Sequence, residues 1–158
     1  MKVKKVSCED LYKFYRYWLE VICLKVNINS TDDINFPNGR QHHILTSKQM
    51  DLLAYMMYNR RLLEVERGIK DDDVLDQLAT NDSGRTKIRL KMGITSQRMY
   101  ELLSDMEKNP AGIITRVPFD NGKLDYYRIN PVFMPIIYNK DNRYSEIMVS
   151  FYNDGVKR

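Results

Sequence analysis

The stretch GRTKIRLKMGITSQRMYELLSDMEK, residues 84–108, decides the fold that this sequence predicts. Residues 85–92 predict a helix in which Ile88 and Met92 lie four positions apart, on one face. Gly93 should end that helix, because a sharp change of chain direction needs a backbone conformation that a side chain opposes. Thr95 or Ser96 then caps a second helix, so the stretch predicts two short helices joined at a glycine corner.

The second helix carries an apolar stripe that packs inward against the first helix, while Ile94 tucks under both. The stripe consists of Met99, Leu102, Leu103 and Met106. The residues left facing outward are Gln97, Arg98, Glu101 and Asp105. Such a pair of helices is a helix-turn-helix. Arg89 stands where these motifs usually place a small residue, and its long side chain can extend outward to solvent.

A β-hairpin is predicted directly after this pair of helices. Residues 113–117 predict one strand, and residues 124–129 predict the returning strand, which stops at Asn130-Pro131. The residues between them contain Asn121-Gly122, a pair favoured in type I′ hairpin turns. A hairpin behind a helix-turn-helix is the order of elements in a winged helix.

The residues on either side complete the predicted organisation. Residues 10–26 carry apolar side chains at helical spacing, with a long buried strand as the alternative, and residues 27–39 predict a loop. Thr46 and Gln49 form a capping-box pattern at the start of a helix that ends at Gly68. A short helix follows Asp71-Asp72-Asp73. The predicted fold is therefore mainly α with a small β-hairpin (α+β), a winged helix-turn-helix at residues 45–131.

Two outer segments flank this unit, an N-terminal helix and loop at residues 1–44 and a C-terminal arm at residues 132–158. In the arm, residues 132–138 follow Pro131 and are interrupted by Pro135, so we expect no regular element there. Residues 145–152 alternate partly between apolar and polar side chains. They predict a last strand that either joins the sheet or lies as an arm on a partner.

Composition excludes several classes of protein. With 158 residues, 43% hydrophobic and 29% charged, the chain suits one folded domain, and its longest apolar run is too short for a membrane span. Its start lacks the apolar core of a signal peptide, so Cys8 and Cys23 are expected to be reduced thiols in a cytoplasm. The adjacent His42 and His43 make a poor zinc site, and the three aspartates suit a helix start better than a metal.

No phosphate-binding glycine loop or nucleophile motif occurs in the sequence, so we expect no enzyme, no cofactor and no small-molecule substrate. The formal net charge of +4, from 25 basic and 21 acidic residues, weakly favours an anionic partner.

Several short motifs resemble those of small winged-helix proteins encoded by tailed bacteriophages. They are Leu45-Thr46-Ser47-Lys48-Gln49, the run from Arg85 to Ser96, and Ile129-Asn130-Pro131. Arg89 in place of alanine is similar to that family's pattern as well. The resemblance covers about four-fifths of the chain when the N-terminal helix is included. It implies a bacteriophage origin and leaves the activity open.

The first functional hypothesis is binding of double-stranded DNA in the host cytoplasm, with the helix after Gly93 in the major groove. The predicted base contacts are Ser96, Gln97 and Arg98. The predicted phosphate contacts are Arg85, Lys87, Lys91, Arg116, Lys123 and Arg128. Glu101 and Asp105 oppose this hypothesis, because they lie four apart near the path of the phosphates.

The alternative hypothesis is a structural component of the virion, such as a head–tail connector or a ring-type assembly protein. Eleven tyrosines, nine methionines, a long loop and a terminal arm suit a chain that packs against phage structural proteins or copies of itself. The winged-helix fold would then serve protein contacts, since a fold does not determine a function.

Overall fold

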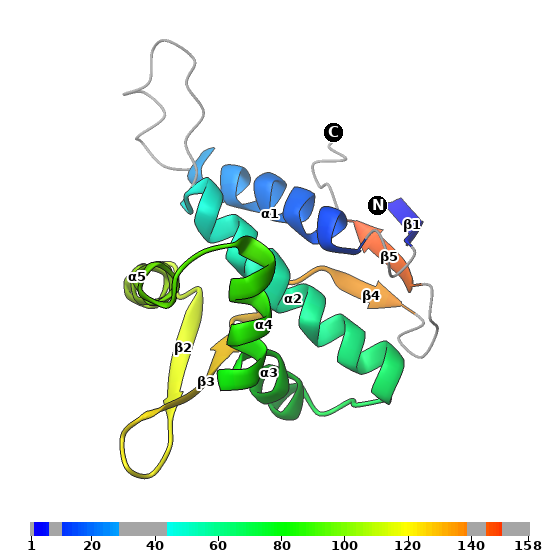
Figure 1. Cartoon of the computed structure of the whole chain (residues 1–158). Helices are drawn as coiled ribbons and strands as arrows, with labels where there is room; N and C mark the ends of the chain where they lie inside the picture. The colour runs from blue at the N-terminus through cyan, green and yellow to red at the C-terminus, as the bar shows by residue number, and fades with distance from the viewer. Residues whose placement is uncertain (1, 7–10, 29–43, 139–144, 150–158) are drawn as a thin grey trace.

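The computed structural model describes residues 2–6, 11–28, 44–138 and 145–149. Its elements are, in order, β1 (Lys2–Val6), α1 (Leu11–Ile28), α2 (Ser47–Arg67), α3 (Asp72–Thr80), α4 (Asp82–Met92), α5 (Ser96–Lys108), β2 (Ile114–Pro118), β3 (Leu124–Ile129), the 3₁₀ helix η3 (Pro131–Phe133), β4 (Ile136–Tyr138) and β5 (Ser145–Val149). The chain is thus mainly helical with a two-stranded hairpin after a helix-turn-helix, which confirms the predicted α+β, winged-helix arrangement (Figure 1).

Helix α2 runs through the middle of the molecule, with α1 along one side and α4 across another (Figure 1). Its start shows the complete capping box: the amide of Gln49 donates to Thr46 Oγ1 at 3.2 Å, and Gln49 Oε1 accepts from the Thr46 amide at 2.9 Å. It ends at Gly68, whose φ of 67° lies in the left-handed region. Both predicted ends of this helix are therefore confirmed.

One hydrophobic core extends from α1 to η3. Leu11, Tyr15 and Trp18 supply the buried face of α1, as the helical spacing predicted, and the alternative of a long strand is wrong. The indole Nε1 of Trp18 donates to the carbonyl oxygen of Phe133 at 2.9 Å, which ties α1 to the residues after the hairpin. The expected boundaries at residues 44 and 131 therefore do not coincide with any break in the core.

A single residue, Asn81, separates α3 from α4. Its amide donates to the carbonyl of Gln77 at 2.8 Å and closes α3, while its side-chain oxygen accepts from the Gly84 amide at 2.9 Å and caps α4. This tight junction brings the first turn of α4 onto the last turn of α3. A Cβ atom at Gly84 would lie 2.2 Å from the carbonyl oxygen of Ala79, so only glycine fits there.

The predicted corner between α4 and α5 is confirmed. Gly93 has φ 66° and ψ 36°, and its amide donates to the carbonyl of Arg89 at 2.9 Å. The amide of Ile94 reaches the same carbonyl, so the last carbonyl groups of α4 are satisfied as in other glycine-ended helices. Thr95, one of the two predicted caps, then accepts from the Arg98 amide at 3.1 Å and starts α5.

Substitution of Gly93 by valine should lower the free energy of unfolding by about 1 kcal/mol or more. No atom lies within 4 Å of an added Cβ, so the cost comes from the positive φ alone, which a β-branched residue strongly opposes. Asparagine tolerates this conformation better, and Gly93→Asn should cost less. Urea unfolding measures both variants, and equal stability of Gly93→Val and wild type would contradict the corner.

The wing has a different turn from the one predicted. Strands β2 and β3 pair antiparallel, but the amide of Gly122 donates to the Phe119 carbonyl at 2.9 Å, and the Phe119 amide donates to the Lys123 carbonyl at 2.7 Å. These bonds enclose a three-residue loop closed by Gly122 at φ 85°. The predicted hairpin is therefore present, but its turn is not the type I′ turn that Asn121-Gly122 favours, because glycine also serves the left-handed position of a three-residue loop.

The C-terminal segment is more regular than predicted. Pro131 begins η3, where its missing N–H costs nothing, and Pro135 directly precedes β4. The expectation of no regular element at residues 132–138 is therefore wrong. The predicted last strand exists as β5, but it lies between β1 and β4 in a separate sheet and does not join the wing. Strand β1, at the other end of the chain, was not predicted.

Candidate nucleic-acid interface

The first turn of α5 projects the three predicted base-contact residues. Ser96, Gln97 and Arg98 are all exposed, and this turn contains no acidic residue. The N-terminus of a helix carries partial positive charge and amide groups that suit an anion such as a phosphate. The structure thus leaves this polar turn exposed at the start of the second helix of the helix-turn-helix.

Acidic residues begin one turn farther along α5. Glu101 lies three positions after Arg98, and the two side chains form an ion pair of 3.4 Å in which each is about half exposed. Asp105 follows Glu101 on the same shallow outer face. The predicted outward side of α5 is therefore confirmed. An exposed pair of this type is weak and can exchange its partner.

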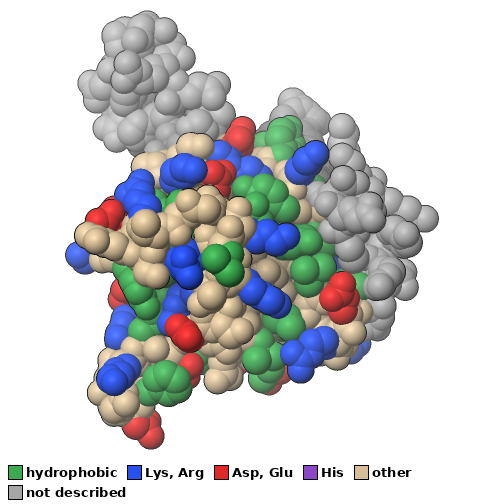
Figure 2. All heavy atoms as spheres, in the orientation of Figure 1, with side chains coloured by type: hydrophobic (Ala, Val, Ile, Leu, Met, Phe, Trp, Pro, Cys, Tyr) green, Lys and Arg blue, Asp and Glu red, His purple; other side chains and the backbone are tan. Residues whose placement is uncertain are grey.

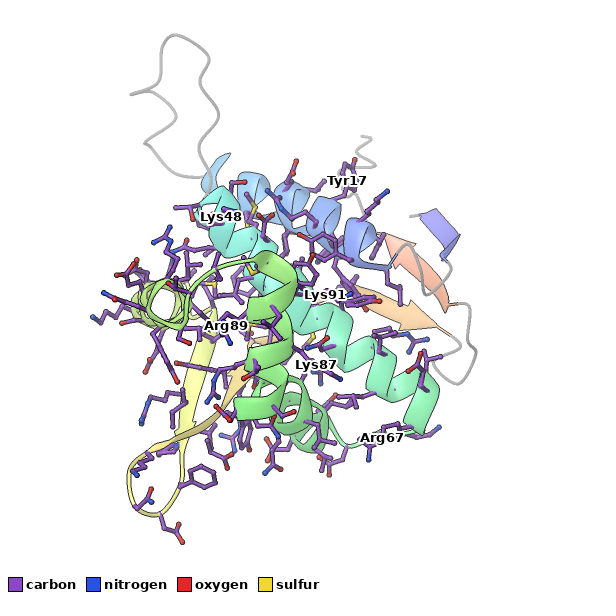
Figure 3. All side chains as sticks on the ribbon, in the orientation of Figure 1. Tyr17, Lys48, Arg67, Lys87, Arg89 and Lys91 are labelled. Carbon is purple, nitrogen blue, oxygen red and sulfur yellow. The ribbon has the colours of Figure 1, made fainter. Side chains whose placement is uncertain are left out.

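Arg89 is a candidate phosphate contact that was not among the residues predicted from the sequence. It lines a small cleft of about 50 Å³ between α4 and α5, together with Ser96 and Tyr100. Figure 3 shows Arg89 on the side of α4 that faces α5. The sequence held one signal for this placement, because Arg89 stands where helix-turn-helix motifs usually place a small residue.

Arg85 itself is buried and cannot meet a phosphate. Its Nη1 donates to the carbonyl oxygens of Thr80 at 2.7 Å and of Asp125 at 3.0 Å, which links α3, α4 and β3. The prediction of a phosphate contact is wrong for this residue. Its guanidinium group instead satisfies backbone carbonyls at the junction of three elements, as a buried charge requires.

Lys87 and Lys91 are exposed, but the structure does not bring them together with the first turn of α5. Both lie on the side of α4 that faces α2, and they line a groove with Tyr58 and Leu62 (Figure 3). The helical period explains this placement, because residues 87 and 91 are rotated away from residues 85 and 89. Their predicted role as phosphate contacts beside α5 has no support in this geometry.

The wing carries three basic side chains that differ in exposure and in bonding partner. Lys123 is exposed next to the loop, and Arg116 is half-buried with its Nη2 donating to the carbonyl of Gly122 at 3.0 Å. Arg128 is exposed and forms an ion pair of 3.0 Å with Asp73 of α3. This contact holds the pKa of Asp73 below its usual range. Lys123 is thus the wing's cation with the greatest freedom to reach a phosphate.

The three consecutive aspartates act in the structure as helix-start residues. Asp71 caps α3 by accepting from the amides of Asp73 and Val74, while Asp72 pairs with Arg60. Within the ranges that the structure describes, no cluster of three metal-ligating side chains occurs. Asp71 is the cap, and Asp72 and Asp73 lie in the first turn of α3, as the sequence predicted for a helix start.

Of the remaining sequence candidates, Cys23 lies within the described residues. Cys23 is buried in the core, and burial raises the pKa of its thiol to about 12, so it is a poor nucleophile. Cys8, His42 and His43 lie outside the described residues. Among the described helices, none combines the length and the apolar character that crossing a membrane requires.

Comparison with protein families, with curated proteins and with solved structures found no match to this chain.

Proposed function

We propose that this chain is a non-enzymatic winged-helix protein that binds double-stranded DNA with the first turn of α5. The observation that supports this most is the exposure of Ser96, Gln97 and Arg98 on the leading turn of the second helix of a helix-turn-helix, with no acidic residue among them. Proteins of this architecture read base edges with that turn while the other helix crosses the backbone.

Each side chain has a chemical role in the proposed complex. Gln97 can form paired hydrogen bonds with adenine, and Arg98 can do so with guanine, while Ser96 suits either base. Arg89, Arg116 and Lys123 would neutralise phosphates on both sides of the groove. Lys87 and Lys91 from the sequence prediction are left out, since both line the groove against α2. Arg128 is left out because its pair with Asp73, at 3.0 Å, is shorter than the 3.4 Å pair that Arg98 would have to exchange.

Entry of α5 by its tip also limits the repulsion from its acidic residues. Glu101 and Asp105 lie about one and two turns beyond the first turn, so they are farthest from the bases when only the tip is inserted. They still repel the phosphates, and affinity should rise when they are neutralised.

A fluorescence-anisotropy titration with duplex DNA at several salt concentrations tests the proposal. Three phosphate contacts predict a slope of about −3 for the logarithm of affinity against the logarithm of salt concentration. Arg98→Ala should weaken binding about tenfold, since it removes a bidentate base contact. The double variant Glu101→Gln/Asp105→Asn should strengthen binding by about a few fold, because it removes like charge near the phosphates.

Arg67→Ala is the matched control, because it removes an exposed arginine at the far end of α2 and should leave affinity nearly unchanged. Binding that is absent, or equally affected by Arg67→Ala and Arg98→Ala, would overturn the proposal.

A second candidate function is a structural component of a bacteriophage particle that uses the fold for protein contacts. The specific observation in its favour is the set of large apolar side chains left at the surface: Tyr17, Val74, Leu90, Tyr100, Phe119 and Val132. Such side chains would be covered by contacts with neighbouring proteins in an assembled particle. Ring-like oligomers in light scattering, or co-purification with phage particles, would favour this candidate and a place in the virion over one in the host cytoplasm.

A further inference from the structure

A groove follows the line between α2 and α4, on a different face from the tip of α5. It consists of a depression of about 340 Å³ and a neighbouring one of about 190 Å³, which share Asn59, Leu62 and Lys87 along their walls. On α2 the lining runs from Tyr55 to Arg67. At the rise of a helix this stretch is about 18 Å long, the length of roughly three helical turns.

The larger depression has a mostly hydrophobic lining. Leu90 projects from α4 and is 66% exposed, although leucine is among the residues most often found inside proteins. Tyr55 and Tyr58 are half-buried on the α2 side, and the ring of Tyr55 stacks on Tyr12 at 4.0 Å between ring centres. The lining therefore presents a stacked aromatic ring next to a leucine whose side chain is mostly exposed.

Basic side chains border this hydrophobic lining. Lys87 and Lys91 lie four residues apart on α4, and Arg67 stands at the end of α2. Figure 2 shows Lys and Arg side chains down this face, with hydrophobic side chains beside them, and Figure 3 labels the three residues. Among the described residues, none of the three has an ion-pair partner. Glu66 is the acidic residue of the lining, at the end next to Arg67.

We propose that this groove binds an acidic amphipathic helix from a partner protein. An apolar stripe on such a helix would cover Leu90 and the tyrosines, and acidic residues at the edge of the stripe would pair with Lys87 and Lys91. Duplex DNA fits the groove less well, because its phosphates would leave the leucine and the tyrosine rings without apolar contact. The proposal goes beyond DNA binding and uses none of the residues on the first turn of α5.

A fluorescein-labelled helical peptide tests the groove on the full chain. The probe is about 15 residues long, with leucine at helical spacing on one face and glutamate beside it. A second peptide replaces glutamate by glutamine, and a third replaces it by lysine. The glutamate peptide should bind, and the glutamine peptide should bind about tenfold more weakly. No binding of the glutamate peptide, or equal binding of the first two, overturns the proposal.

Variants of the groove sharpen this test. Leu90→Asp should reduce affinity for the glutamate peptide by about tenfold or more, and it should fold because the side chain is exposed. Lys87→Glu/Lys91→Glu should lose the glutamate peptide and gain the lysine peptide. Val132→Asp, which changes an exposed apolar residue outside the groove, is the matched control and should leave peptide binding unchanged. Equal effects of Leu90→Asp and Val132→Asp contradict the assignment.

The same variants also test two other possible occupants of the groove, a second copy of this chain and duplex DNA. Self-association in light scattering that Leu90→Asp abolishes would assign the groove to a second copy of the chain and overturn the proposal. Loss of DNA binding in Lys87→Glu/Lys91→Glu, with no change in Arg98→Ala, would assign the groove to nucleic acid and also overturn it. Peptide binding that survives Arg98→Ala supports the groove, whatever the outcome of the DNA titration.

Discussion

Gly84→Ala is expected to lower the free energy of unfolding by about 3 kcal/mol. The added Cβ would lie 2.2 Å from the carbonyl oxygen and 2.5 Å from the carbonyl carbon of Ala79, and both are backbone atoms of α3. Backbone atoms cannot rotate away as the end of a side chain can, so α4 would have to move off α3. That movement would also weaken the contacts of Arg85 with Thr80 and Asp125.

Ser83→Ala is the matched control, because Ser83 lies in the same turn of α4 and is exposed. Its stability should change by less than about 0.5 kcal/mol. Urea unfolding followed by far-UV circular dichroism compares the two variants. Equal midpoints for Gly84→Ala and Ser83→Ala would show that the two helices do not approach as closely as the structure places them.

Arg60→Met is expected to destabilise the protein by about 3 kcal/mol at neutral pH, because it leaves a buried carboxylate without its partner. Arg60 Nε donates to Asp76 Oδ1 at 2.7 Å, and both side chains are about nine-tenths buried. The pair joins α2 to α3. Methionine fills a similar volume to arginine's stem, so the loss should come mainly from the carboxylate that remains and less from packing.

This loss should depend on pH with a definite sign. Burial raises the pKa of Asp76, and Arg60 opposes that rise. Without Arg60 the pKa of folded Asp76 should rise further above its value in the unfolded chain. The folded variant then binds its proton more tightly, so its stability should increase as the pH falls from neutral towards about 4. The difference between Arg60→Met and wild type should therefore shrink in acid.

Arg128→Met is the control for this pair, because Arg128 and Asp73 form a similar ion pair at 3.0 Å but are exposed. Water screens that pair, and the control should be nearly as stable as wild type. The double variant Arg60→Met/Asp76→Leu should recover most of the loss, since it removes both buried charges. A penalty for Arg60→Met that is equal at neutral and acidic pH would contradict this account of Asp76.

Local signals in the sequence predicted the helical part of the fold well. The capping box at Thr46 and Gln49, the end at Gly68 and the corner at Gly93 each depend on backbone groups within a few residues. The physics of a cap is local, so the sequence alone suffices to place it. The same holds for the two strands of the wing, whose pairing needs only a short loop.

Long-range pairing could not be predicted in the same way. Strand β5 lies between β1 and β4, and the partners β1 and β5 come from opposite ends of the chain. No turn signal connects them. Strand β4 spans only Ile136–Tyr138 and follows Pro135 directly, so its sequence resembles a loop until its partner is known.

The candidate site was predicted in part. The exposure of Ser96, Gln97 and Arg98 follows from the apolar stripe of α5, which fixes the opposite face. The phosphate contacts failed at Arg85 because counting charges along α4 does not distinguish its sides. A polar helix with a neighbour on each side needs tertiary structure to show that Arg85 is buried and Lys87 faces α2.

Amide chemical-shift mapping of the ¹⁵N-labelled chain with duplex DNA tests the central claim most directly. We expect the largest shifts at Thr95, Ser96, Gln97 and Arg98, with smaller ones at Lys123, and nearly none along the α2–α4 groove. Shifts confined to Lys87 and Lys91, or no shifts with DNA in excess, would contradict DNA binding by the tip of α5.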